Sequence, residues 1–160
     1  MAIASYLCRV IYKEHTTDGD FTGTYKLLVK SKSIPTPVGT PNEVETTTFE
    51  DGAHTFIPGI KTSDSLEITG NLEKEYLDAI DDLDGQNLDI MQLYGKQGIG
   101  EEAKYAYTGY AYAAPSDVSG IDEVVEMTVK VIKDTVPEKV TDDYTITDNG
   151  DGTFTVAAAA

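Results

Sequence analysis

The stretch Val44–Leu72, VETTTFEDGAHTFIPGIKTSDSLEITGNL, says most about the fold. It contains a threonine-rich extended run, a Pro-Gly dipeptide that predicts a turn, and a strand of alternating side chains over 65–72. Leu66, Ile68, Gly70 and Leu72 share one face of that strand, and Ser65, Glu67, Thr69 and Asn71 share the other. The stretch holds no set of groups that could do chemistry together, so it predicts a structural region.

A single helix is predicted directly after this strand, from Leu72 or Glu73 to about Leu83. Asn71 is the expected N-cap residue, and acidic residues fill the first turn, where the helix dipole favours anions. Apolar residues then recur at helical spacing and form one stripe: Tyr76, Leu77, Ile80 and Leu83. Asp84-Gly85 is expected to end the helix.

Strand signals dominate the rest of the chain. They cover residues 6–13, 24–30, 43–50, 88–94, 104–114 and 124–133, and a final hairpin joins 144–147 to 153–156 across a glycine-rich turn. Seven to nine strands and one helix predict a mainly β fold, a β-sandwich or barrel with one flanking α-helix. We expect one domain over 1–140, followed by a C-terminal hairpin and tail over 141–160.

A proline-rich segment from Ser31 to Asn42 interrupts the strands. Proline cannot donate to a sheet ladder, so the segment predicts a long, exposed and stiff loop. We expect this loop and the threonines behind it to pack against another subunit, because the prolines lower the entropy lost on ordering. The candidate contact residues are Ile34, Pro35, Pro37, Pro41, Glu43, Thr46, Thr47 and Thr48.

The charge of the chain is strongly negative, with 28 acidic residues against 12 basic ones and a formal net charge of −16. Such a surface repels nucleic acid, which suits a protein that DNA must pass without sticking, although solubility alone also explains it. No apolar run approaches the length of a membrane span, and no secretory signal is visible. The single cysteine, Cys8, excludes an internal disulfide and suits a reducing cytoplasm.

The residues offer little for catalysis. Cys8, His15 and His54 do not stand in contexts that mark a thiol–imidazole pair. The glycines over 95–100 lack the spacing of a phosphate loop, and the acidic turns at 81–85 and 148–152 lack the ligand positions of a calcium loop. We therefore expect no enzyme, no metal and no cofactor.

The chain has ten tyrosines and no tryptophan. Tyr110 and Tyr112 are predicted to share one face of their strand, and Tyr105 and Tyr107 the other. A core or subunit-interface role is favoured over a sugar-binding platform, because tryptophan is the preferred stacking residue. A monomeric carbohydrate-binding β-sandwich stays open as an alternative function.

Two stretches together resemble the tail tube (major tail) proteins of long, non-contractile-tailed bacteriophages. In ETTTFEDGAHTFIPGIKTSDSLEITGNL a threonine-rich run leads to Ile-Pro-Gly, a strand and a helix. In YAYTGYAYAAPSDVSGIDEVVEMTVKVIKDTVPEKV an aromatic-Thr-Gly-Tyr strand, a proline-containing turn and a valine-rich strand follow one another. The resemblance covers about residues 5–140, and the C-terminal hairpin departs from the minimal pattern of that family.

The resemblance implies a structural virion protein of the phage tail, assembled in the host cytoplasm. Six copies would form a ring with a shared inner β-barrel, and rings would stack into a hollow tube through which DNA is ejected without specific binding. The implied partners are other copies and the tail terminator, tape measure and tail-tip proteins. A tube protein of a contractile tail or of a type VI secretion-like system has the same fold and stays open.

The inner sheet of such a tube is expected to present a polar, net negative face to the passing DNA. The lumen-lining candidates are the outward positions of alternating strands: Glu67, Thr69, Asn71, Asp89, Glu126 and Thr128.

Overall fold

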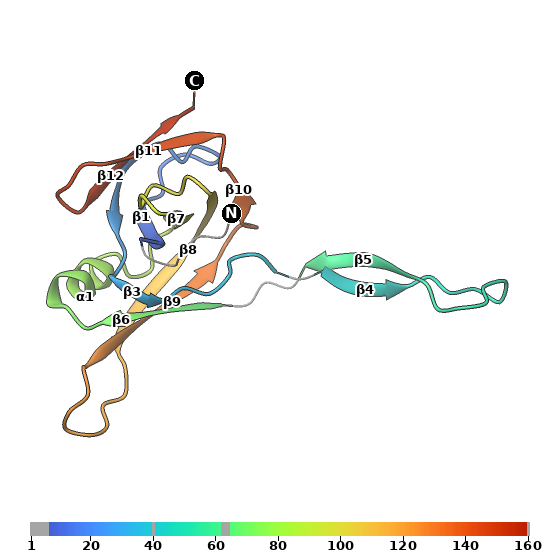
Figure 1. Ribbon diagram of the computed structural model, residues 1–160, viewed down its shortest axis with the longest axis horizontal. Coiled ribbons are helices and arrows are strands. Elements are labelled where there is room, and N and C mark those ends of the chain that lie inside the picture. Colours follow the sequence, from blue (N-terminus) through green and yellow to red (C-terminus); the bar gives the residue numbers. More distant parts are fainter. Residues whose placement is uncertain (1–6, 40, 62–64, 160) are drawn as a thin grey trace.

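The computed structural model describes residues 7–39, 41–61 and 65–159. This part of the chain is mainly β with one short helix, which confirms the predicted fold class (Figure 1). The elements are β1 (Arg9–Glu14), β2 (Gly23–Leu27), β3 (Ser31–Ser33), β4 (Pro41–Glu45), β5 (Phe56–Lys61), β6 (Leu66–Asn71), α1 (Lys74–Asp81), β7 (Leu88–Tyr94), β8 (Ala103–Pro115), β9 (Glu126–Lys133), β10 (Glu138–Lys139), β11 (Tyr144–Asp148) and β12 (Thr153–Ala158). No helix among the described residues is long and apolar enough to cross a membrane.

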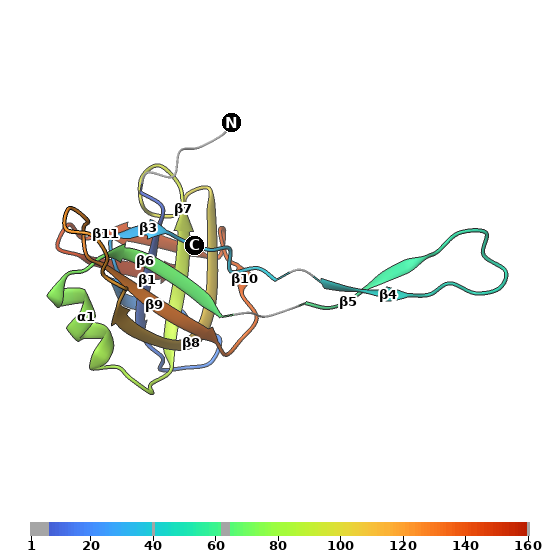
Figure 2. The same cartoon turned by 90° about the horizontal axis from the view of Figure 1, so that it is seen from below.

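One curled antiparallel sheet contains ten of the strands, in the order β11-β12-β2-β1-β7-β8-β9-β6-β3, with β10 paired to β8. Figure 2 shows how the sheet bends around its own centre. The central strand β7 is buried along nearly its whole length. It contributes Leu88 and Ile90 to one hydrophobic core and Met91 and Leu93 to another, so both of its faces are covered.

The first hydrophobic core lies between the central strands and the β9–β6 end of the sheet, with α1 packed over it. Ile90 of β7, Ile68 of β6 and Val129 of β9 are fully buried there. The helix contributes Ile80, which is 1% exposed. Side chains alternate along β9, where Met127, Val129 and Val131 face this core.

The second core lies on the other face of the central strands, beneath the C-terminal hairpin. Phe154 and Val156 of β12 pack here with Tyr25 of β2 and Met91 of β7. Strand β12 also pairs with β2 in the main sheet. The turn between β11 and β12 places Gly150 and Gly152 at φ +80° and +86°, as its glycine-rich sequence predicts.

Strands β4 and β5 form a separate two-stranded sheet that projects far from the main one (Figures 1 and 2). We call residues 41–61 the arm. The turn predicted at Pro58-Gly59 is wrong, since both residues lie within β5. The chain reverses instead near Thr48, whose backbone N–H donates to the Asp51 carboxylate at 2.7 Å. A Cβ on Gly59 would lie 2.9 Å from Val44 Cγ2, so close packing against β4 requires this glycine.

The helix is shorter than predicted. It begins at Lys74, its N-cap residue is Glu73, and that side chain makes no capping hydrogen bond. The expected cap, Asn71, is the last residue of β6 and pairs with Glu126 of β9. The next N–H, that of Leu72, still donates to the Val125 carbonyl at 2.9 Å. Sheet pairing therefore holds the chain extended through the position where the helix was predicted to start.

Candidate assembly surfaces

The described residues hold no group of three or more His, Cys, Asp or Glu side chains that could bind a metal ion. The loop that joins β7 to β8 does not cradle a phosphate either. Its Gln97 N–H donates to the Glu101 carboxylate at 2.9 Å, so an acidic side chain of the protein occupies that backbone donor. An anion approaching this donor would meet a like charge.

His15 is held between two carboxylates. Its Nδ1 lies 2.7 Å from Oδ1 of Asp89, and its Nε2 lies 2.7 Å from Oδ1 of Asp18. The hydrogen bond to Asp89, then that to Asp18, raises the pKa of His15. With both ring nitrogens engaged, the imidazole has no free lone pair with which to act as a base. His54 is likewise paired, through Nδ1 to Glu45 at 2.8 Å.

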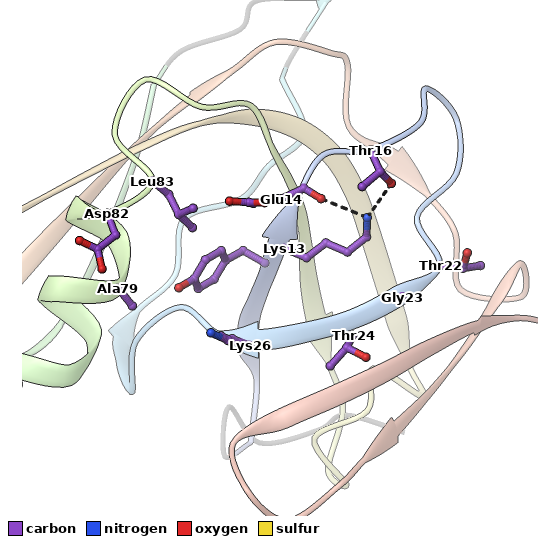
Figure 3. Close-up of a pocket in the computed structure, with 11 residues that line it drawn as sticks. Lys13, Glu14, Thr16, Thr22, Gly23, Thr24, Lys26, Ala79, Asp82 and Leu83 are labelled. Atoms are coloured by element: carbon purple, nitrogen blue, oxygen red, sulfur yellow. Dashed lines mark hydrogen bonds between the residues drawn. The ribbon is translucent and has the colours of Figure 1, made fainter.

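A cavity of about 650 Å³ opens between α1 and strands β1 and β2 (Figure 3). Its lining mixes apolar side chains with both signs of charge: Lys13, Glu14, Lys26, Ala79, Asp82 and Leu83 are among the residues that form it. Lys13 extends along β1 and donates to the Glu14 carbonyl and, at 3.5 Å, to Thr16 Oγ1. The remaining lining residues are Tyr12, Thr16, Thr22, Gly23 and Thr24.

Five of the six lumen candidates lie together on one face of the β6–β9 pair. The register places Glu67 opposite Lys130, Thr69 opposite Thr128, and Asn71 opposite Glu126. Residues directly opposite in an antiparallel pair share a face. Lys32 of β3 adds a second cation, 3.8 Å from Glu126. The face is therefore polar, as predicted, but its two carboxylates are balanced by two lysines.

The sixth lumen candidate, Asp89, does not face outward. It lies on β7 and its side chain is fully buried. Lys13 Nζ is 2.8 Å from Asp89 Oδ2, with His15 on the other oxygen. The prediction of an outward position is wrong because strand alternation was taken to mean one solvated face, whereas β7 is covered on both.

The expected contact loop divides into two parts. At its start, Ser31–Ser33 forms β3, and Ile34 packs against the first core. Pro37 is buried, and its carbonyl accepts a hydrogen bond from Lys133 Nζ at 2.9 Å. The prediction of an exposed loop therefore holds only in part here: Ser33, Thr36 and Val38 are exposed, whereas Pro37 is buried and Pro35 is half-buried. This first part anchors the arm to the main sheet.

The remaining contact candidates lie on the arm: Pro41 and Glu43 in β4, and Thr46, Thr47 and Thr48 beyond it. The threonines link the two strands of the arm by hydrogen bonds. Thr46 Oγ1 is 2.9 Å from Thr55 Oγ1, and the Thr55 N–H donates to Thr47 Oγ1 at 2.9 Å. The arm is thus a braced hairpin, although its residues are almost all solvent-exposed.

The sequence did not predict the apolar side chains that are exposed on the arm and on the loop between β8 and β9. On the arm, Val44, Phe56 and Ile57 are 47%, 53% and 52% exposed, and Phe49 at the tip is fully exposed. The loop between β8 and β9 exposes Val118, Ile121 and Val124 in the same way. The alternation of side chains around Phe56 could have predicted a strand there, but the nearby Pro-Gly dipeptide indicated a turn.

The tyrosines are mostly structural. Tyr107 is fully buried, and its hydroxyl accepts a hydrogen bond from Gln92 Nε2 at 3.0 Å. Burial raises the pKa of Tyr107 and of Tyr25. Among tyrosines in the described segments, Tyr112 is the one exposed on the sheet surface, at 42%. A single exposed ring does not make a sugar-stacking platform.

No protein-family model matches the chain, and no curated protein matches its sequence. Among solved structures, the fold is similar to that of a chain in the six-fold symmetrised cryo-EM structure of the anti-feeding prophage (AFP) baseplate. The TM-score is 0.56 and the sequence identity 11%; the match covers 87% of this chain and 95% of that chain. At this identity the likeness concerns the fold.

Proposed function

We propose that this chain is a structural subunit of a phage-tail-type particle, whose copies form rings that stack into a hollow tube. The observation that carries the proposal is the arm. It is braced by its own hydrogen bonds, yet its exposed Val44, Phe56 and Ile57 have no core to pack on within the described chain. A two-stranded hairpin on its own is only marginally stable in water. Exposed apolar side chains on such a hairpin therefore indicate that it packs against another subunit.

The main sheet supports ring formation at its two ends. Strand β3 is three residues long and, among the described residues, pairs only with the Gly70 end of β6, through Ser31 and Ser33. At the other end, β11 pairs with β12 and has no second neighbour among the strands that the structure describes. Open strand edges are sites where another chain can add a strand. Joining such edges around a symmetry axis yields a closed barrel shared between copies.

The likeness to a baseplate chain of the anti-feeding prophage supports the same class of assembly, because that structure is a six-fold particle component. We propose six copies to a ring by analogy with it. In a phage, the tube would lie in the tail of the virion, be assembled in the host cytoplasm, and contact tail terminator, tape measure and tail-tip proteins. The face of β6 and β9 that carries Glu67 and Glu126 is proposed to line the channel for DNA.

The proposed role is non-catalytic and needs no cofactor. The resemblance described above favours a tube without a contractile sheath. A tube subunit of a contractile tail or of a type VI secretion-like system is the second candidate, because the neighbouring fold comes from the anti-feeding prophage. Finding a sheath protein that assembles around the tube would favour this second candidate over a tube without a contractile sheath.

Assembly of the purified chain tests the proposal. The net charge of −16 opposes association, so the chain is concentrated and the ionic strength raised to screen it. Negative-stain microscopy and sedimentation velocity should then show rings or hollow tubes. A chain that stays monomeric across the whole range of concentration and salt contradicts the proposal.

The role of the arm is tested with an arm-less variant, in which residues 40–64 are replaced by a short glycine-serine linker. We expect a folded subunit that forms no tubes. Its melting temperature should stay within about 5 °C of the parent, because the arm adds nothing to either core. Full-length tubes from this variant would show that the arm is not a stacking element.

A further inference from the structure

We infer that the arm docks onto a second copy of the chain through only one of its two faces, the uncharged face formed by Asn42, Val44, Thr46, Thr55, Ile57 and Gly59. This inference rests on the proposed function, in which copies of the chain contact one another through the arm. It adds which side chains are covered by the neighbour and which stay in solvent.

The register of the hairpin defines this face. Val44 is directly opposite Ile57, and Thr46 bonds across to Thr55 through both backbone and side chains. Gly59 lies against Val44 Cγ2. Opposite residues in an antiparallel pair point to the same side, so these side chains form one surface. That surface carries two half-exposed aliphatic side chains between threonines, and no charge.

The opposite face of the same hairpin is charged. Glu45 is directly opposite Phe56, and Glu43 is opposite Pro58. His54 joins this side through its contact with the Glu45 carboxylate at 2.8 Å. Phe56 is therefore an exposed apolar side chain within an acidic surrounding.

Charge decides between the two faces. A second copy of the chain carries a formal net charge of −16, so a carboxylate placed against it meets repulsion. Docking through the Glu43 and Glu45 side would bring two more carboxylates to an acidic surface. The uncharged face brings none and buries Val44 and Ile57, which supplies hydrophobic driving force.

Pro58 argues against docking by strand addition at the β5 edge. Thr46 N–H donates to the Thr55 carbonyl at 2.8 Å, so Thr46 and Thr55 are a hydrogen-bonded pair. By the alternation of antiparallel ladders, Glu43 and Pro58 are a non-bonded pair, and the nitrogen of Pro58 points away from β4. This outer edge therefore lacks one donor that an added strand would need. Contact through the side-chain face has no such requirement.

Two neighbouring residues provide a matched test, because Ile57 and Phe56 are almost equally exposed and lie on opposite faces. Ile57→Glu and Phe56→Glu add the same charge one residue apart. We expect Ile57→Glu to raise the concentration at which tubes form by about tenfold or more, and Phe56→Glu to leave it within about twofold. Sedimentation velocity of the purified full-length variants measures both thresholds, and thermal unfolding checks that each subunit is folded.

Photo-cross-linking gives a second measurement. With p-benzoylphenylalanine at position 57, irradiated tubes should give covalent dimers; with it at position 56, they should give few. Equal loss of assembly in both glutamate variants, or dimers from position 56 alone, would overturn the one-face inference while leaving the role of the arm intact. Normal assembly of Ile57→Glu would also overturn it. Failure of the proposed function itself has a different signature, namely a parent chain that stays monomeric across the whole range of concentration and salt.

Discussion

Asp89 is held inside the sheet by two partners, the Lys13 ammonium group and the His15 imidazole. Its side chain is fully buried, while that of Lys13 is 11% exposed and that of His15 is 15% exposed. Removing a carboxylate from water costs several kcal/mol, which the ion pair and the imidazole hydrogen bond offset. The cluster ties the end of β1 to β7, and through Asp18 it also holds the loop that follows β1.

At the residue scale, we predict that Asp89→Asn destabilises the fold strongly. Asparagine keeps the size of the side chain but leaves Lys13 without its counter-charge in a buried place. Breaking such a pair from one side costs about 3–5 kcal/mol. Urea denaturation of the monomeric subunit measures the change.

Asp18→Asn is the matched control. The Asp18 side chain contacts the same histidine from the solvent side and is fully exposed. Solvent screens this contact, so the loss should stay below about 1 kcal/mol. Equal effects of the two substitutions would show that the buried pair does not stabilise the sheet.

The sequence around Asp89 could not reveal its burial. Leu88–Tyr94 was correctly predicted as a strand, and its length is right to the residue. Whether its second face is covered depends on β12 and β2, which lie far away in sequence and pack against that face only in the folded chain. Local alternation identifies the two faces of a strand, but coverage of a face is a tertiary property.

At the element scale, turns predicted from Gly, Asp and Pro residues form where strand pairing does not compete with them. The turn at 148–152 forms as predicted, because Asp and Gly residues there accept positive φ. At Pro58-Gly59 the same kind of signal failed. Pairing with β4 placed the proline on an open edge and the glycine under Val44, so the dipeptide is extended. The arm was therefore foreseen as an exposed contact segment, but its hairpin form was not.

The C-terminal hairpin is also an element whose role depends on packing. Its departure from the tail tube pattern suggests an addition to the fold, yet Phe154 is 2% exposed within the second core. The Arg9 guanidinium lies over its ring, 5.0 Å from the centroid. The hairpin thus covers the face of the central strands that would otherwise be open to water.

We predict that Phe154→Ala costs about 3–5 kcal/mol of stability, because it empties a ring-sized volume in that core. Thr145→Ala on the paired strand β11 is the control, since Thr145 is exposed, and its change should stay within about 0.5 kcal/mol. Chemical denaturation measures both. A Phe154→Ala variant as stable as the control would mean that the hairpin is dispensable to the fold.

At the scale of the whole molecule, charge is distributed unevenly. The chain is acidic overall, yet the outward face of β6 and β9 pairs Glu67 with Lys130 and Glu126 with Lys32. Sequence alternation correctly grouped Glu67 with Thr69 and Glu126 with Thr128, but the lysine from β3 is brought in only by the fold. Because its charges balance, this face presents no net positive charge that would hold DNA, and a DNA channel needs such a surface.

The last prediction concerns this face. The double variant Glu67→Lys, Glu126→Lys converts a balanced patch into one with four lysines in each copy and none of its carboxylates. If the patch lines the channel, assembled tubes should retain DNA that the parent tubes release. Retention, measured by co-sedimentation, should fall steeply with added salt because binding by lysines releases counterions. It should be largely lost where the Debye length drops to about 3 Å at 1 M salt.

The control for this prediction reverses two charges at the far end of the helix, with Asp81→Lys and Asp84→Lys. Both side chains are exposed, and lysines near a helix C-terminus are well tolerated. The helix lies over the first core, away from the outward face of β9, so these lysines should not meet DNA in the channel. Because the net charge changes equally in both variants, a general attraction between less acidic tubes and DNA would act on both. Equal DNA retention by the two would therefore show that the Glu67 and Glu126 face does not line the channel.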